Sequence, residues 1–96
     1  MAYDPGAIDA TLAAAVGDEP ALIAELRVAF VESAHNAVAA LEAAEDRAAW
    51  RDATARLTGL AASFGAVRLR AMANRAATLP HDAPTLAKLK RTVARL

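Results

Sequence analysis

The sequence predicts an all-α fold, an up-and-down antiparallel four-helix bundle with a short additional N-terminal helix. Apolar residues make up 56% of the 96 residues but aromatic residues only 4%, and the excess is alanine, the best helix former. Four glycines and four prolines are too few for the many turns of an all-β protein. Apolar residues also recur at helical spacing, without the alternation typical of strands. We therefore expect one helical domain over residues 1–96.

Capping and helix-breaking residues divide the chain into five predicted helices, at about 5–16, 19–44, 47–64, 66–79 and 83–95. Short connections between them favour antiparallel neighbours. The first two helices begin at acid–proline pairs, a pattern typical of helix N-termini, and Gly17 ends the first. The remaining boundaries are set by N-caps at Asp46 and Asp82, by Gly65 and by two prolines, Pro80 and Pro84.

Each predicted helix carries one apolar face. For the first two helices the expected core residues are Ile8, Leu12, Val16, Ile23, Leu26, Phe30, Ala34, Ala37 and Leu41, flanked by Val28, Val31 and Val38. For the last three they are Trp50, Ala53, Leu57, Leu60, Ala61, Phe64, Leu69, Met72, Ala73, Ala76, Leu79, Leu86, Leu89, Val93 and Leu96.

Charge is balanced over the whole chain but not along it. Residues 1–50 hold nine acidic residues against two arginines, a net charge of −7, and residues 51–96 hold nine basic residues against two aspartates, a net charge of +7. We expect the two halves to attract each other in the bundle, and the alternative is that the basic half forms a docking face. A zero total charge, with no aromatic residues between the basic ones, argues against nucleic-acid binding.

Composition excludes several kinds of chemistry. The chain has no cysteine, so disulfides, thiolate metal sites and a cysteine nucleophile are excluded. His35 has no ligand at the next helical turn and His81 lies in the loop before the last helix, so neither predicts a metal site. No apolar run is long enough to span a membrane, and no basic leader precedes one. We expect a cytoplasmic, monomeric protein without metal or cofactor, which binds no membrane.

The helix predicted over 47–64 has an unusual outer face. With 100° per residue, the positions opposite Leu57 are filled by small residues, and a glycine in the middle of a helix costs about 1 kcal/mol relative to alanine. One explanation is that alanine is common throughout this chain and that Gly59 lets a neighbouring helix pack closely. The other is a flat patch that admits a partner. The patch comprises Ala55, Gly59 and Ala62, edged by Arg51 and Thr58.

The run ARLTGLAASFGA at 55–66 resembles the signature of histidine phosphotransfer (HPt) domains, in which a helix reads H-x-L-K-G, followed by small residues, an apolar residue and Gly-Ala. The Gly-Asp-Glu-Pro sequence at 17–20, Phe30 and the stretch 41–50 are also similar to the family, so the resemblance covers nearly the whole chain. Two positions depart from it. Ala55 occupies the place of the phospho-accepting histidine, and Thr58 that of the lysine which offsets phosphoryl charge.

The resemblance implies a degenerate, or pseudo-HPt, protein that docks receiver domains of response regulators, or a histidine kinase, without accepting phosphate. An alanine methyl group cannot act as a nucleophile, so we expect no enzymatic activity. Two alternatives stay open: phosphotransfer through His35 or His81, and a structural bundle that self-associates through the alanine–glycine patch. The expected partner-binding residues are Arg51, Ala55, Arg56, Thr58, Gly59 and Ala62.

Overall fold

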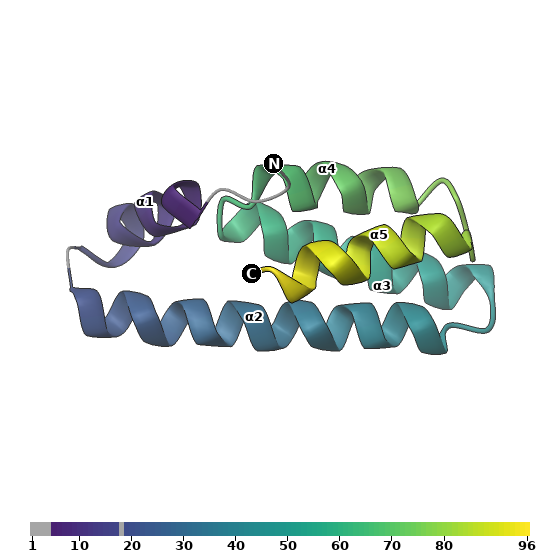
Figure 1. Cartoon of the computed structure of the whole chain (residues 1–96), viewed down its shortest axis with the longest axis horizontal. Helices are drawn as coiled ribbons and strands as arrows, with labels where there is room; N and C mark the ends of the chain where they lie inside the picture. Colours follow the sequence, from purple (N-terminus) through teal and green to yellow (C-terminus); the bar gives the residue numbers. More distant parts are fainter. Residues whose placement is uncertain (1–4, 18) are drawn as a thin grey trace.

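The computed structural model describes residues 5–17 and 19–96, and in these residues it contains five α-helices and no β-strand. The helices are α1 (Pro5–Val16), α2 (Pro20–Ala43), α3 (Arg47–Ser63), α4 (Val67–Ala76) and α5 (Ala83–Ala94). Figure 1 shows α2 running along most of the length of the molecule, with the other helices on one side of it. The all-α prediction is confirmed.

Local signals set most helix ends where the sequence places them. Gly17 and Gly65 adopt the left-handed conformation after α1 and α3, with φ of 81° and 72°. The Asp46 carboxylate accepts a hydrogen bond from the backbone N–H of Ala49 at 2.7 Å, which caps α3. Asp82 caps α5 in the same way, through the N–H of Thr85. The predicted cap of α1 at Asp4 lies outside the described residues.

Helix α4 ends at Ala76, three residues before the predicted end at Leu79. Pro80 stands four residues after Ala76 and has no N–H, so the Ala76 carbonyl cannot receive a regular helical bond. It accepts instead from the Leu79 N–H at 3.0 Å and from the Trp50 indole Nε1–H of α3 at 2.8 Å. A tight turn and a bond from another helix therefore replace the last helical turn.

Helices α2, α3, α4 and α5 contact one another in a ring, and α1 packs on α2. Helix α2 packs against α1, α3 and α5, and α4 packs against α3 and α5. The molecule is elongated, with principal dimensions of 42 × 23 × 17 Å. Helix α3 therefore lies between α2 and α4, and the side of α3 that faces away from them is open to solvent.

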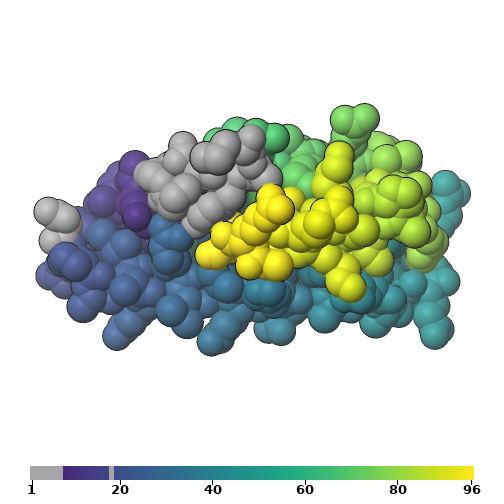
Figure 2. Space-filling model, in the orientation of Figure 1, coloured from purple at the N-terminus to yellow at the C-terminus, as the bar shows by residue number. Residues whose placement is uncertain are grey.

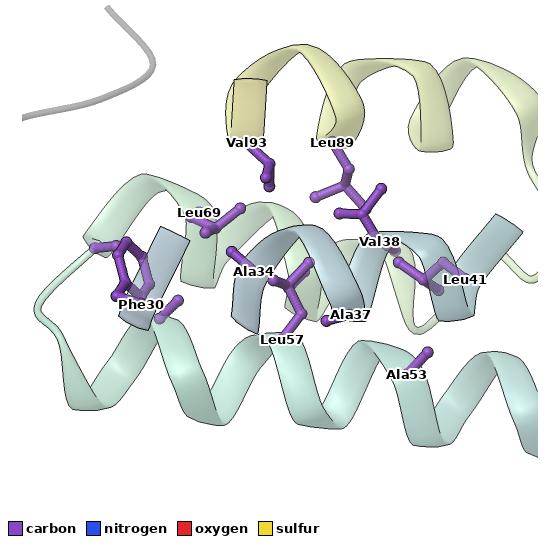
Figure 3. Packing of buried hydrophobic residues seen from close by; sticks show 14 of the residues in the cluster. Phe30, Ala34, Ala37, Val38, Leu41, Ala53, Leu57, Leu69, Leu89 and Val93 are labelled. Atoms are coloured by element: carbon purple, nitrogen blue, oxygen red, sulfur yellow. The ribbon is translucent and has the colours of Figure 1, made fainter. Parts of the chain in front are cut away.

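One apolar cluster holds the helices together (Figure 3). Alanines fill much of it, and such small side chains let helix axes approach closely. Phe30 of α2 stacks on Phe64, which follows α3, with ring centroids 4.8 Å apart. The fully buried large side chains are Ile8, Phe30, Leu41, Trp50, Leu57, Leu69, Leu89 and Val93.

Two apolar residues lie at the surface, one predicted to flank the core and one predicted to belong to it. Val28 is 56% exposed, because it is two residues before Phe30 and therefore about 160° away from it around α2. Leu79 is 40% exposed, because α4 has already ended and helical spacing no longer applies to it. The core prediction was wrong at these positions.

The expected attraction between the acidic and basic halves is visible at one contact in the described part of the chain. Lys90 Nζ lies 3.1 Å from Glu42 Oε2 and so joins α5 to α2. The ion pair between Arg27 and Asp9 joins α2 to α1, within the acidic half. Exposed pairs of this kind are worth about 0–1 kcal/mol, so apolar packing dominates the association of the halves.

Candidate docking face on helix α3

The outer side of α3 carries the residues that the sequence singles out. Ala55, Gly59 and Ala62 are exposed, as are the two arginines at the edges, Arg51 and Arg56, while Thr58 is half-buried. We call these six residues the α3 face. From Arg51 to Ala62 the face extends about 16 Å along the helix at 1.5 Å per residue.

Buried contacts on the opposite side of α3 fix the rotation of the helix. Trp50, Leu57 and Ala61 are buried in the core. Trp50 is also tied to α4 by its indole hydrogen bond. Thr54 is fully buried, and its hydroxyl donates to the backbone carbonyl of Arg51 at 2.9 Å. Because these contacts lock one side inward, the α3 face is held toward solvent.

Gly59 makes no close packing contact with another helix among the described residues. A Cβ atom placed on it would meet no heavy atom within 4 Å, apart from its own chain neighbours and the nearby helix backbone. The explanation that Gly59 lets a neighbouring helix of this chain pack closely is therefore wrong. The glycine lowers the stability of α3, and no contact with the described residues offsets this cost, which favours the explanation of a flat surface patch.

A shallow groove of about 380 Å³ adjoins the α3 face on the side of α2. Its walls are mostly alanine side chains of the two helices, and Asp52 and Arg56 line it as well. Asp52 is not among the residues that the sequence pattern assigns to the site. Asp52 lies four residues before Arg56, hence on the same side of α3, and it lowers the positive potential around that arginine.

The α3 face holds no group that can accept a phosphoryl group in the way histidine does. Ala55 presents a methyl group at the position where the HPt signature has its histidine. The two histidines lie elsewhere. Helical spacing predicts His35 at the boundary between the core and solvent faces of α2, but it is exposed. Three or more His, Cys, Asp or Glu side chains do not cluster as a metal site among the described residues.

His81 has a structural setting that the sequence did not reveal. It lies in the loop between α4 and α5 with a φ of 60°, and the Asp82 N–H donates to the Leu79 carbonyl across the turn. Proline followed by a residue of positive φ is typical of a type II turn. The imidazole ring lies against Trp50, with ring centroids 5.3 Å apart. These contacts give His81 a role in closing the loop.

The comparisons with known proteins add no relative. Neither protein-family models, nor curated proteins, nor solved structures gave a match to this chain. Within the part of the chain that the structure describes, none of the helices combines the length and apolar character that crossing a bilayer requires. The functional argument therefore depends on the α3 face and on the sequence resemblance.

Proposed function

We propose that this protein is a pseudo-HPt module of a two-component phosphorelay, an antiparallel four-helix bundle that docks receiver domains through the α3 face without accepting phosphate. The observation that carries the proposal is Gly59, an exposed glycine inside a helix that makes no close packing contact with another helix among the described residues. The HPt-like run at 55–66 supports it, since the same helix bears the resemblance and the open face.

Docking follows from shape and charge. The small side chains of Ala55, Gly59 and Ala62 let the rim of a receiver's active site approach the α3 backbone closely. The arginines at the two edges of the face attract the acidic pocket that receivers carry, which raises the rate of encounter. Because Asp52 offsets part of the charge of Arg56, we expect Arg51 to contribute more than Arg56. A receiver bound here cannot pass its phosphoryl group to the methyl group of Ala55. Occupancy without transfer makes the protein a competitor or a scaffold in the relay.

The central experiment is an NMR titration of isotope-labelled protein with a panel of receiver domains, with and without beryllofluoride as a phosphoryl mimic. Amide shifts should gather on residues 51–62. Gly59→Leu should abolish them, because it adds bulk to the α3 face while leucine keeps a high helix propensity. The matched control is Ala39→Leu, which adds similar bulk to the exposed side of α2. Intact binding by Gly59→Leu, or no shift with any receiver, would refute the docking proposal.

A second experiment separates docking from transfer. The protein is incubated with a phosphorylated receiver that docks, and acid-labile, base-stable adducts are sought by mass spectrometry. We expect none. An adduct on His35 or His81 would show that the module transfers phosphate.

Sedimentation over a range of concentrations should show a monomer. A dimer that Gly59→Leu dissociates would instead assign the α3 face to self-association.

A further inference from the structure

A second surface, between α4 and α5, combines a cavity with cationic side chains. The cavity has a volume of about 230 Å³. Its lining includes four apolar residues, Met72, Leu79, Pro84 and Leu89, and two cationic ones, Arg75 of α4 and Lys88 of α5. Figure 2 shows the yellow C-terminal part of α5 on the outside of the molecule. We call this surface the basic groove.

The register of the two helices places more cations along the same groove. Arg75 and Lys88 share the cavity, while Thr92 Oγ1 lies 3.5 Å from Met72 Sδ, so α4 and α5 run antiparallel. Arg68 precedes Arg75 by seven residues and so lies two turns away on the same side of α4. Arg95, the C-cap of α5, follows Lys88 by seven residues and keeps a helical backbone conformation. From this register we infer a second cationic pair, Arg68 and Arg95, about 10 Å along the helices from the first.

No acidic residue of α4 or α5 neutralises these cations, because the sequences of both helices contain none. Asp82, just before α5, accepts hydrogen bonds from the N–H and the hydroxyl of Thr85, which also lines the cavity. Its single negative charge offsets only part of the charge of Arg75 and Lys88. The exposed ion pair of α5 uses Lys90, which reaches Glu42 on the α2 side. The groove therefore keeps a positive potential that a negatively charged partner would complement.

We propose that the basic groove binds an acidic peptide segment of a protein partner, with one aliphatic side chain in the cavity and carboxylates on the flanking cations. Part of the apolar lining is recessed: Leu89 is fully buried and Met72 half-buried, whereas Leu79 and Pro84 are exposed. A flat bilayer surface does not reach into such a recess, whereas a single side chain does. The groove has no aromatic residue on which nucleic-acid bases would stack, so a peptide fits it better than a single strand. This proposal concerns a surface other than the α3 face and does not depend on the docking of receivers.

The test uses a fluorescein-labelled peptide in which leucines are spaced among runs of glutamate and aspartate. Binding is followed by fluorescence anisotropy and by amide shifts of the labelled protein. We expect saturable binding, with shifts along the facing sides of α4 and α5. A peptide with serine in place of leucine should bind several-fold more weakly, because the cavity stays unfilled. Binding should also weaken as salt is added.

Charge reversal on the protein provides the matched comparison. Arg75→Glu/Lys88→Glu should weaken binding about tenfold or more, since two exposed attractions become repulsions. Arg47→Glu/Arg70→Glu changes the net charge equally at exposed arginines outside the groove, and it should leave binding within about twofold of the original protein.

Three results would overturn the proposal. The first is the absence of saturable binding. The second is an equal loss of binding in both charge-reversed proteins, which would mean that the attraction is non-specific. The third is tighter binding of vesicles of phosphatidylserine, or of single-stranded DNA, at the same groove, which would assign the groove to another class of partner.

Discussion

Replacement of Gly59 by alanine should make the isolated protein more stable. Gly59 lies four residues before the last residue of α3, it is exposed, and an added Cβ meets nothing within 4 Å. The substitution therefore removes the backbone entropy cost of glycine in a helix without creating a clash, a gain of about 0.8–1 kcal/mol. For a domain of this size such a gain raises Tm by about 4–8 °C. Thermal unfolding followed by circular dichroism measures it directly.

The reverse substitution on the same face is the control. Ala62 is exposed three residues further along α3, and Ala62→Gly should lower Tm by a similar amount. The double substitution Gly59→Ala/Ala62→Gly should restore the original Tm within about 2 °C, because the two changes exchange one glycine for another. If Gly59→Ala leaves Tm unchanged or lowers it, the added methyl group clashes with a neighbouring part of the protein, and the inference that this face is open is wrong.

Three other substitutions test the contacts that position α3 and α5. Trp50→Phe removes the indole bond to the Ala76 carbonyl and leaves a void, so it should cost about 2 kcal/mol in urea denaturation; a cost under about 0.5 kcal/mol would show that the bond is dispensable. Asp46→Ala removes the cap of α3 and should cost about 1 kcal/mol, and an unchanged urea midpoint would contradict the capping role. Hydrogen bonds from the hydroxyl and N–H of Thr85 lower the pKa of Asp82 below its ordinary value. The ionised Asp82 therefore stabilises the folded protein fully at pH values above the ordinary pKa, and this stabilisation is lost as the pH falls through the lowered pKa. The free energy of unfolding of Asp82→Asn, measured over the same acidic range, should not show this decrease. Parallel pH profiles for the original protein and Asp82→Asn would refute the role of the Asp82 carboxylate.

Features encoded within a few neighbouring residues could be predicted from the sequence. The caps at Asp46 and Asp82 and the left-handed glycines at 17 and 65 were expected, and the structure confirms them. Their geometry depends on local backbone hydrogen bonds and on φ, so no knowledge of the fold is needed. The outer side of α3 was predicted for the same reason, since helical spacing alone decides which of its residues lie opposite Leu57.

Features that depend on contacts between helices were missed. The end of α4 at Ala76 involves the indole of Trp50, 26 residues earlier in the chain. Thr54 and Thr92 are buried, although hydroxyl residues usually lie outside a core. Their hydroxyls donate to backbone carbonyls three and four residues earlier, so burial leaves no donor unpaired. Thr54 lies three residues before Leu57 and Thr92 three residues after Leu89, and this helical spacing from core leucines could have predicted their burial.

The two proposed surfaces should act independently, which makes their tests separable. The α3 face and the basic groove share no residue, and the groove lies on the α5 side of α4. Substitutions without shared partners usually add within about 0.3–0.5 kcal/mol, which is about a twofold change in affinity. Gly59→Leu should therefore leave binding of the acidic peptide within about twofold, and Arg75→Glu/Lys88→Glu should do the same for a docked receiver. If either change removes both activities while circular dichroism shows an intact fold, the surfaces belong to one continuous interface. A single larger partner would then replace the two that we propose.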